Sequence, residues 1–169
     1  VMPSYINEDD FVATDIKKLV GVLAIAKAES VVKKILRENL DSKINCEVLG
    51  VLGCDSLFEF NGEIFGKPKT AIEALNRWQQ MSSKSGFLHT GHCLMYKEKL
   101  GEELRSKEFK GIVREVISTK INFSKLSYQE IVQYIETQEP MNCAGGFAIE
   151  GKGSIFIESI EGCYSNVIG

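Results

Sequence analysis

The sequence predicts an α/β protein, because segments with helical spacing alternate along the chain with segments of strand-like residues. The strongest local signal is an Asn-Gly pair between two short strand-like runs, which is typical of a β-hairpin. Two capping boxes mark the starts of further helices. With 169 residues, of which 44% are hydrophobic and 25% charged, the chain fits one domain, residues 1–169, with a sizeable core.

The first helix is expected over residues 15–37, where apolar residues recur at helical spacing. Lys27 is the one charged residue that interrupts this apolar stripe, and Thr14 is the expected N-cap. Asn39–Asn45 is predicted to be a polar loop. The apolar run Cys46–Leu52 then predicts a short buried strand.

The stretch Gly53–Pro68, GCDSLFEFNGEIFGKP, contains the predicted hairpin. With Asn61 and Gly62 as the two residues of a type I′ turn, Phe60 pairs with Glu63. The same register continues outward, so the two open ends of the hairpin also lie beside each other. An acidic residue stands near one open end and a lysine near the other, which is an arrangement that a phosphate-handling site would use.

Asp55 and Lys67 fall on neighbouring rungs of this extrapolated hairpin. Directly opposed residues share a face and successive residues alternate, so regular pairing would turn these two side chains to opposite faces. Both can reach one site only if a bulge or a strand end lies near Ser56–Lys67, or if a third element lies between them. Without further information, the residues favour the simpler interpretation of a solvent-exposed acid and lysine at the mouth of a hairpin.

The remaining helices are predicted by their capping boxes. A T-x-x-E box at residues 70–73 predicts a helix over about Ala71–Met81. An S-x-x-E box at residues 127–130 predicts a second helix that continues to about Thr137. In both boxes the hydroxyl and the glutamate satisfy backbone amides that the first helical turn leaves free, which fixes the helix start.

Strands are expected in three places in the second half of the chain. Leu88–Lys97 and Gly111–Phe123 have strand-like composition, and the second of them alternates between apolar and polar residues. The charged segment 97–110 between them is predicted to be a mobile loop. The glycine-rich end of the chain is expected to contain a further strand at Ser154–Ile160.

Composition excludes several classes of partner. The net charge of −3 provides no basic field for nucleic acid or for an anionic membrane, so an anionic ligand needs a local binding site. No apolar window is long enough to span a membrane, and the first residues lack the features of a signal peptide. Five cysteines without a C-x-x-C pair indicate reduced thiols, and therefore a cytoplasmic protein.

A near-match to a P-loop and an H-x-x-H pair are weak evidence for a phosphate site and a zinc site. Gly146–Gly153 nearly matches a P-loop, but glycine replaces the final hydroxyl residue and a strand-like run follows instead of a helix. His89 and His92 have the spacing H-x-x-H outside a helix, whereas zinc-binding pairs are four residues apart on a helix. Each histidine is therefore expected to be a hydrogen-bonded structural residue.

The carboxylates Glu8, Asp55 and Glu150 are the better candidates for chemistry. Each stands beside a predicted turn or strand end. Hard cations such as Mg²⁺ favour carboxylate oxygens and commonly bridge to substrate phosphates. If the fold brings these side chains together with Lys67, they would suit metal-assisted phosphate chemistry.

Several of these motifs resemble the Maf family, which comprises nucleoside triphosphate pyrophosphatases also described as septum formation inhibitors. PSYINE near the start is similar to an acidic segment of the family, and GCDSLFEFNGEIFGKP resembles its G-x-D-[TS]…GKP block. SGFLHTGHCL matches a family strand loosely. The final segment from FSKLSYQEI to GCYSNVIG matches the family's C-terminal half closely.

The resemblance implies an elongated mixed β-sheet flanked by helices, with two lobes around a cleft, as in inosine triphosphate pyrophosphatases. It implies hydrolysis of a nucleoside triphosphate to the monophosphate and pyrophosphate, with Mg²⁺ or Mn²⁺ as cofactor. Asp55 would be the proton acceptor, and Glu8, Asp55 and Glu150 would bind the metal. Lys67 would bind the triphosphate, and Ser56 and Glu150 would influence the choice of substrate. A homodimer is expected from the family alone.

Three departures from the family pattern limit what the resemblance implies. Glu150 stands where a pyrimidine-preferring branch has glutamine and a branch preferring 7-methyl-GTP has glutamate, so the nucleobase stays open. Ser56 replaces the commoner threonine. The family's N-terminal strand, its S-P-R-R loop and its extreme C-terminus are not found in the sequence, so an inactive nucleotide binder is one alternative. A regulatory protein that inhibits septum formation by partner binding is another, suggested by the family's second name and by the charged segment 97–110.

Overall fold

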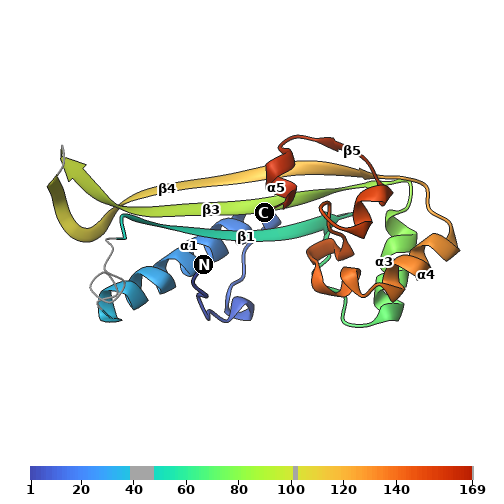
Figure 1. Ribbon diagram of the computed structural model, residues 1–169, viewed down its shortest axis with the longest axis horizontal. Coiled ribbons are helices and arrows are strands. Elements are labelled where there is room, and N and C mark those ends of the chain that lie inside the picture. Colours follow the sequence, from blue (N-terminus) through green and yellow to red (C-terminus); the bar gives the residue numbers. More distant parts are fainter. Residues whose placement is uncertain (39–47, 101–102, 169) are drawn as a thin grey trace. The chain divides into compact units, whose positions relative to one another are not determined.

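The computed structural model describes residues 1–38, 48–100 and 103–168, and of residues 99–100 and 103–107 the backbone alone. Its five-stranded sheet has the order β2-β1-β3-β4-β5 (Figure 1). The strands are β1 (Gly50–Phe60), β2 (Glu63–Ile64), β3 (Ser85–Leu100), β4 (Glu103–Phe123) and β5 (Ile157–Glu161). The α-helices are α1 (Ile16–Glu38), α3 (Ala71–Met81), α4 (Tyr128–Glu136) and α5 (Tyr164–Ile168). The predicted α/β class is therefore confirmed.

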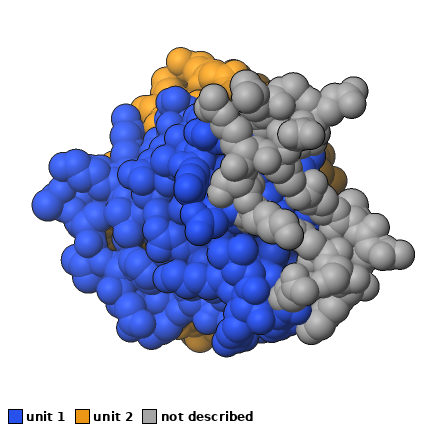
Figure 2. Space-filling model, turned by 90° about the vertical axis from the view of Figure 1, so that its left-hand side faces the viewer, with its two compact units in different colours: residues 1–55, 91–116 blue, residues 56–90, 117–169 orange. Residues whose placement is uncertain are grey.

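The chain forms two compact units, coloured separately in Figure 2. Unit 1 comprises residues 1–55 and 91–116, and unit 2 comprises residues 56–90 and 117–169. Each unit has its own cluster of buried apolar residues. The boundaries between the units fall inside β1, β3 and β4, so three strands each contribute residues to both units.

In unit 1, α1 packs closely on the backbone of two strands. A Cβ atom on Gly53 would lie 2.3 Å from the carbonyl oxygen of Ala24, and one on Gly91 would lie 2.2 Å from that of Val20. Real side chains do not come this close, so both strand positions require glycine. The small residues Ala24 and Ala28 are fully buried on the facing side of α1.

The start of α1 differs from the prediction by one residue. The backbone amide of Lys18 donates to the Asp15 carboxylate at 2.8 Å, so Asp15 and not Thr14 caps the helix. Thr14 instead accepts a hydrogen bond from the Lys18 ammonium at 3.2 Å. Sequence pattern did not separate these two neighbouring residues, because both are good N-caps.

The hairpin between β1 and β2 has the predicted register. Phe60 pairs with Glu63 in antiparallel orientation, and Asn61 and Gly62 have positive φ angles of 52° and 81°, as a type I′ turn requires. β2 ends at Ile64, and Lys67 lies in a bend beyond the paired strand. The predicted strand end is confirmed, so the face rule for paired residues does not apply to this lysine.

Aromatic side chains fill the core of unit 2. Trp78 of α3 makes edge-to-face contacts with Phe123, Tyr134 and Phe156, at centroid distances of 5.4 to 5.6 Å. The Trp78 indole also donates to the carbonyl oxygen of Gly146 at 3.0 Å. Both predicted capping boxes start helices of this unit: α3 begins at Ala71 as expected, and α4 has a complete capping box.

Some predicted boundaries were wrong. β3 continues to Leu100 and β4 begins at Glu103, so segment 97–110 is mostly strand and not a loop. Antiparallel pairing can continue into a charged segment because the backbone provides the hydrogen bonds. The strand predicted at Ser154–Ile160 begins at Ile157 after a 3₁₀-helix, and that predicted at Cys46–Leu52 begins at Gly50. The loop predicted at 39–45 lies outside the described residues, as does Cys46.

Candidate active site

Asp55 occupies a buried position of β1. The unit 1 part of this strand alternates between exposed and buried residues, with Val51, Gly53 and Asp55 on the buried face against α1. The Asp55 residue is only 7% exposed. A carboxylate in such a position costs free energy unless it has a charged or hydrogen-bonding partner, so its surroundings decide its role.

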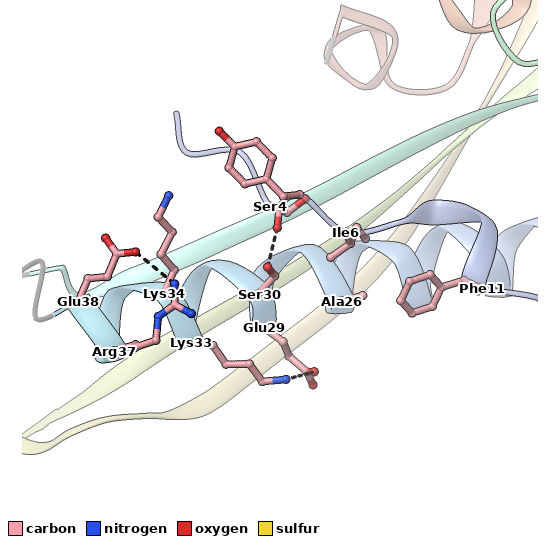
Figure 3. Close-up of a pocket in the computed structure, with 11 residues that line it drawn as sticks. Ser4, Ile6, Phe11, Ala26, Glu29, Ser30, Lys33, Lys34, Arg37 and Glu38 are labelled. Atoms are coloured by element: carbon pink, nitrogen blue, oxygen red, sulfur yellow. Dashed lines mark hydrogen bonds and ion pairs between the residues drawn. The ribbon is translucent and has the colours of Figure 1, made fainter.

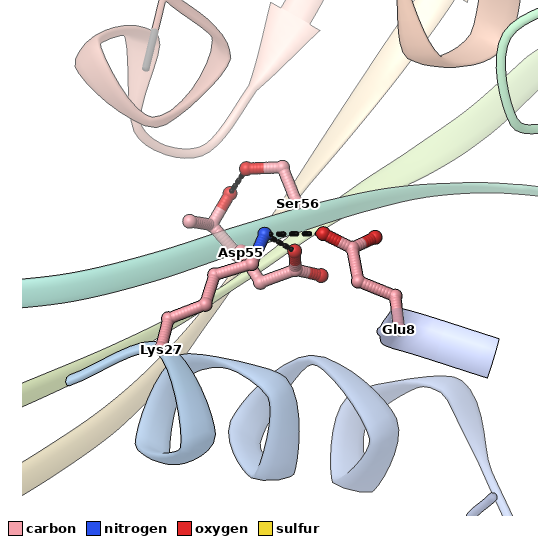
Figure 4. Close-up of polar contacts among 5 residues, drawn as sticks. Glu8, Lys27, Asp55 and Ser56 are labelled. Atoms are coloured by element: carbon pink, nitrogen blue, oxygen red, sulfur yellow. Dashed lines mark hydrogen bonds and ion pairs between the residues drawn. The ribbon is translucent and has the colours of Figure 1, made fainter. Parts of the chain in front are cut away.

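Lys27 of α1 provides that partner. Its ammonium nitrogen lies 2.5 Å from Asp55 Oδ1 and 2.8 Å from Glu8 Oε1 (Figure 4). Glu8 begins the short 3₁₀-helix Glu8–Asp10, which precedes α1 in the chain. Unit 1 therefore brings two of the predicted carboxylates together around a lysine. Sequence reasoning assigned no role to Lys27. The one signal for such a role was that Lys27 is a charged residue in the otherwise apolar stripe of α1.

The three charges act on one another. Burial raises the pKa of Asp55 above its ordinary value, and although Lys27 opposes this shift, the negative charge of Glu8 adds to it. Burial would lower the pKa of Lys27, but its hydrogen bonds and ion pairs with Asp55 and Glu8 outweigh this and raise it. Lys27 is therefore held as a cation beside a carboxylate that is a stronger base than usual.

Glu8, Lys27 and Asp55 together form the Asp55 cluster, and one carboxylate oxygen of this cluster has no hydrogen-bond partner among the described residues. Asp55 Oδ2 is buried and makes no hydrogen bond with the described residues, whereas Glu8 is about half exposed, at 54% of its side chain. A buried, unpartnered carboxylate oxygen beside a second carboxylate is a donor set that fits a hard divalent cation. Within the described residues no group of three or more metal-binding side chains occurs, so these two carboxylates would form only part of the coordination shell.

Unit 2 contains a second group of predicted residues. Ser56 and Glu150 line one cavity of about 170 Å³, together with Cys143 and Asn166. The Ser56 hydroxyl is 2.8 Å from the Thr90 hydroxyl. The cavity is smaller than sites that enclose a whole ligand of drug size, so it suits one part of a larger molecule.

Lys67 is exposed at the bend after the hairpin. Burial raises the pKa of the Cys143 thiol; the carboxylates of Glu139 and Glu150 add to that effect, and the charge of Lys67 opposes it. Lys67 and Glu150 therefore both act electrostatically on a residue that lines the cavity.

The near-match to a P-loop differs from a phosphate-binding loop in the partners of its backbone amides. Lys152 and Gly153 donate their backbone amides to the Glu139 carboxylate at 2.8 and 2.9 Å. These amides are the groups that a phosphate-binding loop would offer to its ligand. Because a carboxylate already occupies them, the rejection of this motif is supported by the geometry.

The two histidines differ. His89 is buried and hydrogen-bonded through both ring nitrogens, to Ser118 Oγ at 2.8 Å and to Glu59 Oε2 at 2.9 Å. The prediction of a satisfied structural residue is confirmed for His89. It was wrong for His92, whose buried Nδ1 has no hydrogen-bond partner in the described part of the chain.

A larger cavity of about 630 Å³ lies in unit 1 between the N-terminal segment and α1 (Figure 3). Its wall includes several cations, but they have partners: Lys33 lies 3.9 Å from Glu29, and Arg37 lies 3.3 Å from Glu38. Lys34 lies over the Tyr5 ring. None of the predicted site residues lines this cavity.

The fold and the cluster define an α/β protein with a buried, lysine-bound carboxylate that is suited to accepting a proton. Comparison with known proteins identifies the family. The family model described as Maf-like protein matches residues 1–169. The chain therefore belongs to the Maf-like protein family.

Similar proteins carry a consistent name. A nucleoside triphosphate pyrophosphatase of Prochlorococcus marinus (strain SARG) is 55% identical over 173 residues, which cover 100% of this chain and 80% of that protein. Proteins of the same name from strains NATL2A and MIT 9312 are 51% and 46% identical, covering 89% and 98% of this chain, and 70% and 80% of those proteins.

Proposed function

We propose that this protein is a nucleoside triphosphate pyrophosphatase, which hydrolyses its substrate to the nucleoside monophosphate and pyrophosphate. The name of its relatives supports the reaction class. The observation that carries the proposal is the buried Asp55 carboxylate, whose basicity is raised by burial and whose position is held by Lys27. No helix in the described parts of the chain is long and apolar enough to cross a membrane.

Asp55 would act as the general base. It would accept a proton from a water molecule as the water oxygen forms a bond to the α-phosphorus, and the bond from that phosphorus to the pyrophosphate oxygen would break. A carboxylate with a raised pKa is a stronger base, so burial supports this step. The Lys27 ammonium would hold the carboxylate in place and stay charged throughout.

A divalent cation, Mg²⁺ or Mn²⁺, would supply neutralisation of the triphosphate charge when bound. Glu8 and Asp55 are the residues on which the structure supports such a role, because both carboxylates lie at one cluster and Asp55 Oδ2 has no other described partner. Glu150 remains a proposed third ligand from the sequence. The exposed Lys67 would bind the phosphates electrostatically.

Ser56 and Glu150 would contribute to substrate choice, because both line the small cavity of unit 2. The volume of about 170 Å³ suits a nucleobase and not a whole nucleotide. The carboxylate of Glu150 can accept hydrogen bonds from base N–H groups, whereas the Ser56 hydroxyl is already within hydrogen-bonding distance of Thr90.

The decisive experiment is pyrophosphate release by the full-length protein with Mg²⁺ or Mn²⁺ and a panel of nucleoside triphosphates. Asp55→Asn is expected to lower the rate by roughly 100-fold to 10,000-fold, because it removes the proton acceptor and keeps the shape. Asp15→Asn is the matched control, since an exposed asparagine still caps α1 and should keep full activity. Full activity of Asp55→Asn would overturn the assignment of the base. Binding without hydrolysis by the wild type would favour the inactive nucleotide binder.

A further inference from the structure

Asn166 of α5 lines the same cavity as Ser56 and Glu150, but no sequence motif assigned it a role. The residue is only 8% exposed. Its Oδ1 atom is buried and has no hydrogen-bond partner among the described residues. A buried acceptor of this kind costs free energy in the absence of a ligand, and so suggests a partner that is supplied from outside the chain.

The hydrogen bonds of Thr119 fix the orientation of the Asn166 amide. The Thr119 hydroxyl donates its one hydrogen to the carbonyl oxygen of Cys163 at 3.1 Å. It can therefore only accept from Asn166, and Asn166 Nδ2 lies 3.1 Å from it. The nitrogen end of the amide is thus held by Thr119, which leaves the oxygen end as the acceptor.

We propose that Asn166 Oδ1 accepts a hydrogen bond from an N–H group of the nucleobase, and that Asn166 is therefore a specificity-determining residue. This inference rests on the proposed function, because it deepens the substrate choice of the same cavity. The cavity lining holds two acceptors for the base, the Glu150 carboxylate and Asn166 Oδ1. The Ser56 hydroxyl is already within hydrogen-bonding distance of Thr90, and the Cys143 thiol is only a weak donor. These two acceptors would favour a base whose edge presents N–H donors over a base in which that donor is methylated.

The test compares nucleotide pairs that differ by one donor: guanosine triphosphate with its 1-methyl derivative, and uridine triphosphate with its 3-methyl derivative. For the preferred base, wild-type protein is expected to favour the N–H member by roughly tenfold or more in kcat/KM. Asn166→Leu, which keeps the approximate volume but removes the acceptor, is expected to lose this preference. Asn166→Asp keeps an acceptor and is expected to retain it.

Two further variants distinguish the loss of the Asn166 acceptor from a general effect of misfolding. Thr119→Val frees the amide to rotate and is expected to weaken the preference while leaving Asn166 in place. Asn122→Leu is the matched control, because the Asn122 amide bonds to Ser159 and Glu161 outside the cavity and its loss should leave the preference unchanged. The fluorescence of the single tryptophan, Trp78, reports whether each variant is folded.

A binding readout separates this inference from the proposed function. Cys143 lines the cavity, so a bound nucleoside monophosphate should slow alkylation of its thiol, which peptide mass spectrometry distinguishes from the other cysteines. Donor-dependent protection that is lost in Asn166→Leu, without any hydrolysis, would support the role of Asn166 and overturn the pyrophosphatase. Hydrolysis with an unchanged preference in Asn166→Leu would overturn the role of Asn166 alone. No hydrolysis and no protection by any nucleotide would overturn both.

Discussion

At the scale of single residues, the Asp55 cluster combines opposing electrostatic effects. Burial and the Glu8 charge raise the pKa of Asp55, and Lys27 lowers it, with burial as the largest effect. Without the charge of Lys27, the pKa of Asp55 would be higher still. Without burial, the pKa of Asp55 would not be raised in this way, and the carboxylate would be an ordinary weak base. Lys27 thus keeps the carboxylate ionised while burial makes it basic.

This balance predicts opposite shifts for two substitutions. In the proposed mechanism the ionised form of Asp55 accepts the proton, so kcat/KM should fall as the pH drops through the raised pKa of Asp55. Lys27→Met removes the effect that lowers this pKa and should move the acid limb to higher pH. Glu8→Gln removes an effect that raises it and should move the limb to lower pH. Both are measured as pH profiles of pyrophosphate release.

Lys27→Arg is the control for this pair, because it keeps the positive charge and should leave the limb nearly unchanged. Shifts of the same sign in Lys27→Met and Glu8→Gln would contradict the assignment of the limb to Asp55. An unmoved profile in both variants, whatever the rate, would likewise contradict that assignment.

At the scale of elements, unit 1 depends on the close approach of α1 to the sheet. Gly53 and Gly91 have no room for a Cβ atom because the helix backbone lies against them. This contact places Lys27 of α1 beside Asp55 of β1, since the two side chains come from the packed faces. The glycines therefore have an effect on the site although neither takes part in the chemistry.

Gly91→Ala is expected to destabilise the protein by about 1–3 kcal/mol, because the added methyl group would force α1 away from its strand. Gly21→Ala makes the same change inside α1, where the nearest atom is 3.6 Å away, and it should stabilise the protein by roughly 1 kcal/mol through helix propensity. Urea unfolding followed by circular dichroism measures both. Equal effects of the two substitutions would show that α1 does not pack as described.

At the scale of the whole molecule, the proposed role of Asp55 and the stability of the fold make opposite demands on this residue. Its folded pKa is raised above that of the unfolded chain, so the folded form binds the proton more tightly. The stability that protonated Asp55 contributes is therefore lost as the pH rises above 3.8, which is the pKa of this carboxyl group in the unfolded chain. A protein selected for stability alone would not place a carboxylate at this position.

Asp55→Asn is accordingly expected to be inactive but more stable than the wild type at neutral pH. The gain should disappear as the pH falls below the unfolded pKa of 3.8, where the wild-type carboxyl is itself neutral in both states. Thermal melts across this pH range measure the difference, with about 2–4 °C expected for each kcal/mol in a protein of this size. A lower Tm than that of the wild type at neutral pH would show that the ion pair with Lys27 outweighs burial.

Much of the fold follows from local signals in the sequence. The register of the hairpin, the bounds of α3 and the capping box of α4 were predicted because turns and caps are made by hydrogen bonds between near neighbours. The extent of β3 and β4 was not, because pairing between strands continues where side-chain composition gives no signal.

The sequence by itself determined the hairpin, the starts of α3 and α4 and the family resemblance, and through that resemblance Asp55 as the candidate base. Only the tertiary structure joined Lys27 to Asp55 and Glu8, and only it showed Asn166 as an unpartnered acceptor in the cavity of Ser56 and Glu150. The physical reason is that caps and turns depend on residues a few positions apart. The ionisation of a carboxylate and the satisfaction of an amide depend instead on burial and on partners from distant parts of the chain.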